Sequence, residues 1–435
     1  MIARTAWAWL LRLLLPLIFV RLWWRGRREP GYREAWRERL GFGAASPPGA
    51  VWVHAVSLGE TRAAAALVDA LRARVPAVRL LLTHGTATGR EAGRALLRAG
   101  DHQCWLPYDT PGATRRFLQR HRPAVGVLME TEVWPQLILQ AHAAGVPMVL
   151  ANARLSERSA RKGARLSALI APAARALDLV LAQTRDDAAR LSAAGAREVD
   201  VIGNLKFDMA PDAALVARGR QWRQALGRAV VMMASSREGE EQPLLQAWLA
   251  QPVPRPLLLL VPRHPQRFDV VAQIVRDAGA ILERRSQWTD TPPAAAHAAD
   301  VWLGDSLGEM PLYYAASDVA LLGGSFAPLG GQNLIEAAAC ACPVVMGPHT
   351  FNFEQAADNA IAERAALRVA GIDEGVARAI EVTRDALHAQ WSERAAAFAQ
   401  MHKGAARRMA DRIVQLAGAR IGAGAADSAR VELAR

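Results

Sequence analysis

Charged side chains stand at a few turns where apolar runs of the chain end. The first is VWVHAVSLGE over residues 51–60, in which an apolar run meets a Ser-Leu-Gly turn and then Glu60. A carboxylate in this position can take a proton from a hydroxyl group, which is general-base chemistry. An acid in the first turn of a helix also stabilises the helix dipole, so Glu60 alone allows a purely structural interpretation.

Further charged turns follow two other apolar runs of the first half. Glu130 and Glu132 come directly after AVGVLM, and neither burial nor helix pairing explains two acids at this spacing. A second carboxylate near Glu60 would orient a substrate or tune the pKa of the base. Lys206 stands in GNLKFD and is either solvated or able to reach an anionic leaving group.

Two turns of the second half carry residues suited to an anionic ligand. Arg263 lies in LLLLVPRHPQRF between Pro262 and the His-Pro that follows, and the prolines fix the backbone so that the arginine is pre-aimed. The planar guanidinium group matches phosphate. Leu307–Glu309 opens a predicted helix after the strand-like VWLGD.

A glycine-rich segment, LLGGSFAPLGGQNLIEAA, precedes another predicted helix that begins near Gln332. Glycine pairs let the backbone approach a ligand closely, and a helix start offers N–H groups to phosphate. Asn333 and Glu336 are three residues apart and therefore share one helix face, where the carboxylate can accept from both hydroxyls of a ribose. The segment predicts a nucleotide-sugar site in the second half of the chain.

The elements that position these turns are apolar strands alternating with helical patterns. The predicted strands are Val51–Val56, Val78–Thr83, Ala124–Met129, Pro147–Ala151, Asp178–Gln183, Val199–Ile202, Ala229–Ala234, Pro256–Pro262, Val301–Gly304, Asp318–Leu322, Pro343–Met346 and Leu367–Val369. Uniformly apolar strands separated by helices predict parallel sheets covered on both faces, here as two doubly wound α/β domains. Ligands of such sheets bind beyond the carboxyl ends of the strands, so two facing domains predict a cleft lined by the charged turns. A polar helix around Tyr32–Leu40 and a long amphipathic stretch over Glu374–Ala417 flank the domains.

Composition narrows the class of protein. The chain has 435 residues, more than one hydrophobic core usually supports, and a formal charge of +12 that favours an anionic partner such as a lipid or a phosphorylated substrate. The arginines are scattered and no nucleic-acid-binding signature is present, so no nucleic-acid partner is expected. Three cysteines are too few for a disulfide framework, and their spacing matches no metal site. The missing G-x-G-x-x-G after the first strand disfavours a dinucleotide dehydrogenase.

The first 28 residues form an apolar stretch with tryptophans near its ends and a basic exit, WWRGRR. No small-residue cleavage site of a secretory signal is evident. Arg12 makes the stretch a poor spanning helix, so we predict a membrane anchor that lies in, or barely crosses, the bilayer. The alternative is a helix packed on the body of the protein.

Taken in order, the motifs HAVSLGE, METEVWP, NLKFD, PRHP, LGEM and GGSFAPLGGQNLIEAA resemble the Kdo transferases of lipopolysaccharide synthesis, which move 3-deoxy-D-manno-octulosonic acid (Kdo) from CMP-Kdo to a lipid A precursor. The resemblance implies a GT-B fold, a membrane-associated N-terminus and an inverting, metal-independent mechanism. It implies that Glu60 is the catalytic base and that Glu130 and Lys206 stabilise the transition state. The CMP-binding residues that it implies are Pro262, Arg263, Leu307, Gly308, Glu309, Asn333, Leu334, Ile335 and Glu336.

Patterns and resemblance together predict the organisation of the chain. The expected parts are a membrane anchor over 1–28, an acceptor-binding Rossmann-like domain over 29–203, an interdomain connector over 204–228, a CMP-sugar-binding Rossmann-like domain over 229–385, a helical segment over 386–420 and a flexible tail over 421–435. The expected partners are CMP-Kdo, an acylated and phosphorylated disaccharide of the lipid IVA type, and the cytoplasmic face of the anionic inner membrane of a Gram-negative bacterium. No metal or other cofactor is expected.

Two other functions fit the same features. One is another GT-B enzyme that uses a UDP-sugar, either a transferase or an epimerase, whose second half would look similar. The other is a non-catalytic, membrane-attached protein that binds a nucleotide sugar and needs no base. The number of Kdo units transferred and the acylation and phosphorylation of the acceptor stay open.

Overall fold

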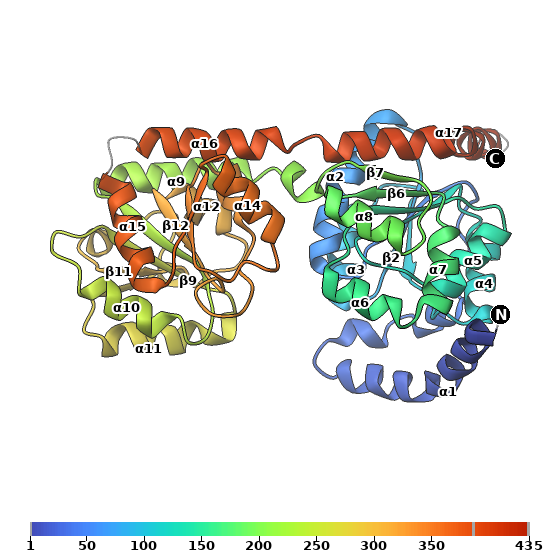
Figure 1. The fold of residues 1–435 in the computed structure, drawn as a ribbon, viewed down its shortest axis with the longest axis horizontal. Coiled ribbons are helices and arrows are strands. Elements are labelled where there is room, and N and C mark those ends of the chain that lie inside the picture. The colour runs from blue at the N-terminus through green and yellow to red at the C-terminus, as the bar shows by residue number, and fades with distance from the viewer. Residues whose placement is uncertain (1, 385–387, 433–435) are drawn as a thin grey trace. The chain divides into compact units, whose positions relative to one another are not determined.

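The structure is a computed structural model and describes residues 2–384 and 388–432. The chain divides into two compact units (Figure 1). Unit 1 contains Met1–Met209 together with Gly404–Arg435, and unit 2 contains Ala210–Lys403. Each unit is built around one parallel sheet of seven strands, which confirms the predicted α/β class with two doubly wound domains.

The sheet of unit 1 has the strand order β3-β2-β1-β4-β5-β6-β7. Its strands are β1 Val51–His54, β2 Leu80–His84, β3 His102–Trp105, β4 Val125–Met129, β5 Met148–Ala153, β6 Leu179–Ala182 and β7 Val199–Val201. The strands are added outward from β1 to β3 on one side and from β4 to β7 on the other, so the order of addition reverses between β1 and β4. Val51 of β1 pairs in parallel with Leu80 on one side and with Val125 on the other. Such a switch point is where doubly wound sheets bind their ligands.

Helices cover both faces of the unit 1 sheet. They are α1 Ile2–Arg25, α2 Leu58–Arg74, α3 Ala87–Arg94, α4 Pro111–His121, α5 Pro135–Ala143, α6 Glu157–Ala164, α7 Ser167–Arg175, α8 Arg185–Ala193 and α17 Ala405–Glu432, with the 3₁₀ helices η1 Pro30–Arg33, η2 Trp36–Leu40 and η3 Leu205–Asp208. On one face α2 and α17 bury side chains such as Leu67 and Met409 against the strands. On the other face α4, α5 and α7 pack side chains such as Phe117 and Ile138.

Unit 2 repeats the architecture with the order β10-β11-β9-β8-β12-β13-β14, so its switch point lies between β8 and β12. Its strands are β8 Val230–Ser236, β9 Leu257–Pro262, β10 Leu282–Arg284, β11 Val301–Leu303, β12 Val319–Leu322, β13 Val344–Met346 and β14 Ala366–Arg368. Its helices are α9 Ala213–Leu226, α10 Glu241–Leu249, α11 Phe268–Asp277, α12 Met310–Ala315, α13 Leu334–Ala339, α14 Glu354–Ala362, α15 Ile372–Arg384 and α16 His388–Met401, with the 3₁₀ helices η4 Pro265–Arg267, η5 Arg285–Gln287 and η6 Ala294–His297.

All twelve strands predicted from apolar runs are present, and two further strands, β3 and β10, were not predicted. Both are edge strands, and their sequences HQCW and LER carry polar residues because an edge strand is covered on fewer sides. The helix predicted around Tyr32–Leu40 is instead the pair η1 and η2.

The segments outside the strands differ from the prediction in several places. The segment 204–228, expected as a connector, holds η3 in unit 1 and α9 in unit 2, where α9 packs on α12. The stretch over Glu374–Ala417 is broken into parts of α15, α16 and α17, and residues 385–387 lie outside the described residues. α17 belongs to unit 1 and continues to Glu432, past the point at 421 where a flexible tail was expected; the last three residues lie outside the description.

Candidate active site

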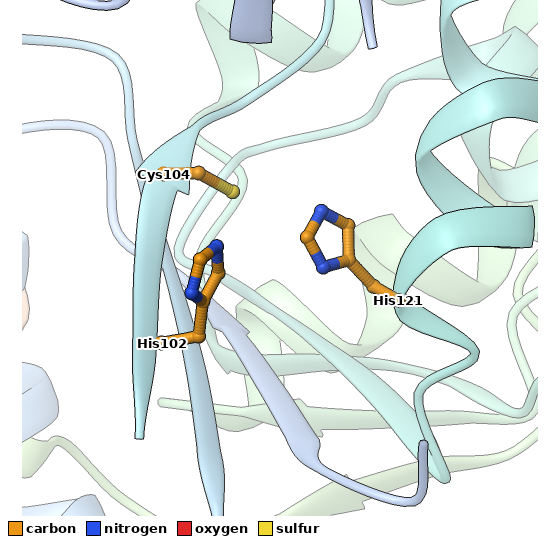
Figure 2. A group of neighbouring side chains, drawn as sticks. All are labelled: His102, Cys104 and His121. Carbon is orange, nitrogen blue, oxygen red and sulfur yellow. The ribbon is translucent and has the colours of Figure 1, made fainter. Parts of the chain in front are cut away.

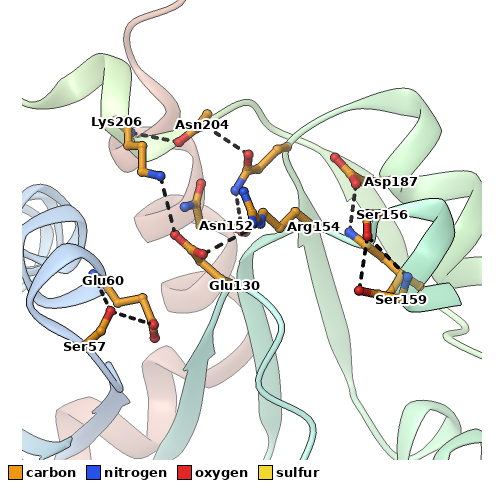
Figure 3. Close-up of polar contacts among 12 residues, drawn as sticks. Ser57, Glu60, Glu130, Asn152, Arg154, Ser156, Ser159, Asp187, Asn204 and Lys206 are labelled. Atoms are coloured by element: carbon orange, nitrogen blue, oxygen red, sulfur yellow. Dashed lines mark hydrogen bonds and ion pairs between the residues drawn. The ribbon is translucent and has the colours of Figure 1, made fainter. Parts of the chain in front are cut away.

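In unit 1 the charged turns gather at the carboxyl ends of the strands that flank the switch point (Figure 3). Glu60 follows β1, Glu130 follows β4 and Arg154 follows β5. Because β1, β4 and β5 are adjacent parallel strands, their ends meet at one edge of the sheet. Lys206 reaches the same edge from η3, which follows β7.

Glu60 is held by the start of α2. Ser57 is the N-cap residue, and its hydroxyl accepts the backbone N–H of Glu60. The carboxylate accepts two hydrogen bonds at 2.9 Å, one from the Ser57 hydroxyl and one from the Val56 backbone N–H. This S-x-x-E arrangement resembles a capping box, so the carboxylate has a structural role at the helix start. The same two bonds also fix its orientation, as a catalytic base requires.

The electrostatic surroundings make Glu60 a better proton acceptor than an exposed glutamate. Burial raises the pKa of its carboxyl group, against the lowering effect of the bonds from Val56 and Ser57, and the negative charge of Glu130 raises the pKa further. Among the described residues no cation lies within ion-pair distance of Glu60, and its side chain is partly exposed. The carboxylate is therefore neither buried in an ion pair nor closed off from a substrate.

Glu130 is the centre of a small polar group beside Glu60. Its carboxylate lies 3.9 Å from Nζ of Lys206 and 3.9 Å from Nε of Arg154, each on a different oxygen (Figure 3). Its backbone has a φ of 57°, in the left-handed region that costs a non-glycine residue roughly 1–2 kcal/mol. Backbone strain of this kind concentrates at functional sites. The group brings together Glu130 and Lys206, as the sequence predicted, and adds Arg154.

Two residues that the sequence analysis left without a role also belong to this edge. Glu132 is partly buried, and burial together with the charge of Glu60 raises its pKa to about 7. Asn152 is fully buried near the end of β5 and has a left-handed backbone. Its side-chain oxygen accepts the N–H of Leu205, while its amide nitrogen has no partner within the described ranges of the chain. The sequence analysis named Glu132 beside Glu130 without giving it a role of its own. Nothing local in the sequence indicates Asn152, because its importance comes from strand adjacency.

In unit 2, Arg263 follows β9, whose last residue is Pro262. The backbone N–H of Arg263 donates to the carbonyl of Ser236 at the end of β8, which ties the turn to the adjacent strand. The Arg263 side chain is exposed, and no carboxylate of the described residues lies within ion-pair distance of it. The structure therefore presents the guanidinium group at the carboxyl edge of the sheet, where the sequence analysis expected a phosphate ligand.

The turn after β11 is more constrained than the sequence suggested. Gly308 has a φ of 82°, which favours glycine, and Leu307 is exposed. Glu309 accepts hydrogen bonds from Ser306 and from two arginines, Arg285 at 2.9 Å and Arg218 at 2.5 Å. Burial by itself raises the pKa of Glu309, but these bonds and charges outweigh it, so the pKa lies below the usual value. The Glu309 carboxylate is thus engaged in fixing the turn.

The glycine-rich loop after β12 corrects one expectation. Its glycines were expected to let the backbone approach a ligand closely, but the N–H of Gly324 donates to both oxygens of the buried Glu240, at 2.8 and 2.9 Å. Two of the loop glycines are also tightly packed: a Cβ at Gly323 would lie 2.2 Å from the Ser235 carbonyl, and one at Gly330 would lie 2.5 Å from the side chain of Asn352. These glycines allow close packing of loops, and an internal carboxylate takes the anion position of the turn.

The residues of the predicted ribose contact divide into two kinds. Leu334 and Ile335 are buried in the core, so they anchor α13 and offer only backbone atoms to a ligand. Asn333 is the N-cap residue of α13, and its side-chain oxygen accepts the N–H of Ile335 at 3.1 Å. Glu336 is partly exposed, and its carboxylate accepts one bond of 3.3 Å from Asn333. Glu336 thus keeps acceptor capacity for hydroxyl groups.

One group of side chains in the described residues has the make-up of a metal site. His102 and Cys104 on β3 and His121 on α4 place ligand atoms within 4.8 Å of one another (Figure 2). Sequence spacing did not indicate this group, because His121 arrives from a separate helix. β2 separates β3 from β1, so the group does not lie on the two strands that flank the switch point.

The chain is similar in sequence to proteins of one family over most of its length. Residues 34–209 match the family described as 3-Deoxy-D-manno-octulosonic-acid transferase (kdotransferase). The 3-deoxy-D-manno-octulosonic acid transferase of Bordetella pertussis is 50% identical over 417 residues, which cover 92% of this chain and 96% of that protein. The Haemophilus influenzae enzyme of the same name is 35% identical over 86% of this chain and 88% of its own length.

Among solved structures, that of Anabaena Alr3699/HepE in complex with UDP has a TM-score of 0.57 and 16% identity, covering 84% of this chain and 99% of that one. This likeness supports the GT-B-like fold. The extent and identity of the match to the Bordetella enzyme go further than the fold: the chain belongs to the 3-deoxy-D-manno-octulosonic acid transferase family, the glycosyltransferases that add Kdo in lipopolysaccharide synthesis.

Proposed function

We propose that this glycosyltransferase moves Kdo from CMP-Kdo to an acylated, phosphorylated disaccharide of the lipid IVA type, with inversion at the sugar carbon and without a metal ion. The observation that carries the proposal is Glu60: a partly exposed carboxylate with a raised pKa, oriented by two hydrogen bonds at the switch point of unit 1. We assign the lipid acceptor to unit 1 and the nucleotide to unit 2.

In the proposed step the hydroxyl oxygen of the acceptor attacks the anomeric carbon of Kdo while its proton passes to the Glu60 carboxylate. The bond from that carbon to the phosphate oxygen breaks, and CMP leaves with the bonding electrons. A single displacement of this kind inverts the carbon and needs no covalent sugar–enzyme intermediate. General-base assistance is worth roughly 10²–10⁴-fold.

The departing CMP is a monophosphate and carries less charge than a diphosphate, so arginine and lysine side chains suffice to stabilise it. We assign this role to Arg263 in unit 2, whose guanidinium group is exposed and has no carboxylate partner in the described residues. Lys206 and Glu130 are assigned to stabilising the transition state beside the base. Glu336 is assigned to the ribose hydroxyls.

We also propose that α1 anchors the enzyme on the cytoplasmic face of the inner membrane. The helix is long and apolar enough to cross a bilayer, and its large apolar side chains, Leu13 and Leu17 among them, are exposed. The acceptor is itself a lipid, so an anchored enzyme works where its substrate is made.

The test is product analysis with the purified enzyme. CMP-Kdo and lipid IVA are incubated with the protein in detergent. CMP release is measured, and the mass of the lipid product is determined by mass spectrometry. The expected product is heavier by one or more Kdo residues. Thermal shift with CMP and with UDP provides a second readout, because a ligand stabilises the protein that binds it. Stronger stabilisation by UDP would favour a UDP-sugar enzyme, and CMP-Kdo held but never consumed would indicate a binding protein.

A further inference from the structure

A cavity of about 910 Å³ lies in unit 1 among α1, α4 and α5. Each of these helices presents one face to it. α1 contributes Arg4, Ala8 and Arg12, which are spaced four residues apart and so share a face. α4 contributes Arg115, and Arg122 follows directly after that helix. Polar amides from α5 and the side chain of Arg420 on α17 complete the lining.

The charge of this cavity is uncompensated. Among the residues whose side chains the structure describes, five arginines line it and no aspartate or glutamate does. All five side chains are exposed, and in the described part of the chain none has a carboxylate within ion-pair distance. Elsewhere in unit 1 several arginines are paired, as Arg72 is with Asp101 at 2.5 Å. Like charges around one cavity repel each other, so an anion bound there relieves a cost that the free protein carries.

The position of the cavity indicates where that anion comes from. At about 100° per residue, Leu10, Leu13 and Leu17 fall on the side of α1 opposite to Arg4 and Arg12. These leucines are exposed, whereas the arginine side packs toward the body of unit 1. α1 is thus a mainly apolar helix that turns two arginines toward the cavity and several exposed leucines away from it. Arginine side chains beside an apolar membrane helix lie at the level of the lipid headgroups.

No residue that lines the cavity has an assigned part in the transfer reaction. Arg122 and Pro123 precede β4, and Val146 precedes β5, so this part of the lining lies near the amino ends of the strands. Glu130, in contrast, follows the carboxyl end of β4. Pro111 and Gln136, at the starts of α4 and α5, also line the cavity, so the lining runs along both helices.

We propose that the arginine cavity binds the phosphate headgroup of an anionic bilayer phospholipid and so holds α1 and unit 1 at the membrane. The inference rests on the proposed membrane placement of α1 and not on the proposed transfer reaction. It adds a lipid site whose lining holds no residue assigned to the reaction, and it makes membrane binding selective for anionic lipid.

The experiment measures binding of the full-length protein to vesicles of phosphatidylcholine with and without phosphatidylglycerol, in the absence of any sugar donor. The test variant is Arg115→Gln/Arg122→Gln, which leaves α1 untouched. The matched control is Arg158→Gln/Arg161→Gln on α6, which removes the same charge from exposed positions outside the cavity. A basic residue near an anionic surface contributes about fivefold in affinity, so the test variant should lose roughly thirtyfold on anionic vesicles. Arg115→Lys/Arg122→Lys should retain most of the binding.

The outcomes separate the alternatives. Loss on anionic vesicles in the test variant alone, with wild-type binding to neutral vesicles and a wild-type melting temperature, supports the proposal. Equal loss in the control overturns it, because the effect is then one of net charge. If inorganic phosphate displaces the protein from anionic vesicles and binds as tightly as they do, the ligand is free phosphate and not a lipid headgroup, and the proposal is overturned. Binding to neither kind of vesicle overturns the membrane placement of α1 and this inference together, while CMP release in detergent still tests the transfer reaction.

Discussion

Replacing Glu60 by glutamine separates its two roles at the start of α2. The amide has nearly the same shape, and its oxygen can still accept the N–H of Val56, while its nitrogen can donate to the Ser57 hydroxyl. The charge at the helix N-terminus is lost, which costs about 0.3–1 kcal/mol. The raised pKa of Glu60 shows that the folded protein disfavours the ionised form, so the neutral amide offsets part of that cost. We expect the free energy of unfolding to change by less than about 1 kcal/mol.

Catalysis should respond very differently, because glutamine cannot accept the proton of the acceptor hydroxyl. A general base contributes roughly 10²–10⁴-fold, which corresponds to about 2.7–5.4 kcal/mol of transition-state stabilisation. We therefore expect kcat for CMP release to fall at least about a hundredfold, with the melting temperature nearly unchanged. In the wild type, kcat/KM should fall as the pH drops through the raised pKa of Glu60, since the base must be ionised, and this limb should be absent in the variant.

The assay follows CMP release from CMP-Kdo with lipid IVA in detergent, at several pH values. Glu157→Gln is the matched control, because Glu157 is also an acid in the first turn of a helix but is exposed and has no assigned part in the reaction. A Glu60→Gln enzyme within about tenfold of wild type, less than the smallest general-base contribution, would refute the assignment. An equal loss in Glu157→Gln would show that the assay reports helix stability.

Four further substitutions test the surroundings of both sites. Lys206→Ala should lower kcat about a hundredfold, as loss of a preorganised charge does, with Lys206→Arg recovering part of it in the same assay. Arg263→Ala should raise KM for CMP-Kdo roughly ten- to hundredfold without lowering the melting temperature, because the side chain is exposed. The pKa of Glu132 is raised to about 7 in the folded protein, so the stability that it contributes is present at low pH and is lost as the pH rises through 7. In urea unfolding, Glu132→Gln should therefore have a higher free energy of unfolding than wild type at pH 8 but not at pH 4. Glu240→Ala leaves the N–H of Gly324 without its acceptor and should lower the free energy of unfolding by about 1–3 kcal/mol in the same urea titration.

Local sequence patterns predicted the positions of several charged side chains in the fold. A turn that follows a buried parallel strand lies at the ligand-binding edge of its sheet, so the positions of Glu60, Glu130 and Arg263 followed once the strands were recognised. Lys206 was also placed at the edge where it lies, because η3 follows the last strand of the sheet. Edge strands such as β3 escaped recognition because they carry polar residues and lack the uniform apolar run of a central strand.

The sequence by itself determined the two sheets, the apolar N-terminal helix and the acids and bases at the strand ends, because apolar periodicity and turn residues act over a few neighbours. Only the tertiary structure decided how distant groups meet. It placed Arg154 against Glu130, turned the buried Asn152 toward η3, and filled the glycine-rich loop with Glu240. It also gathered arginines from separate helices around one cavity. Such contacts depend on strand order and helix packing, which bring together residues that no local pattern relates.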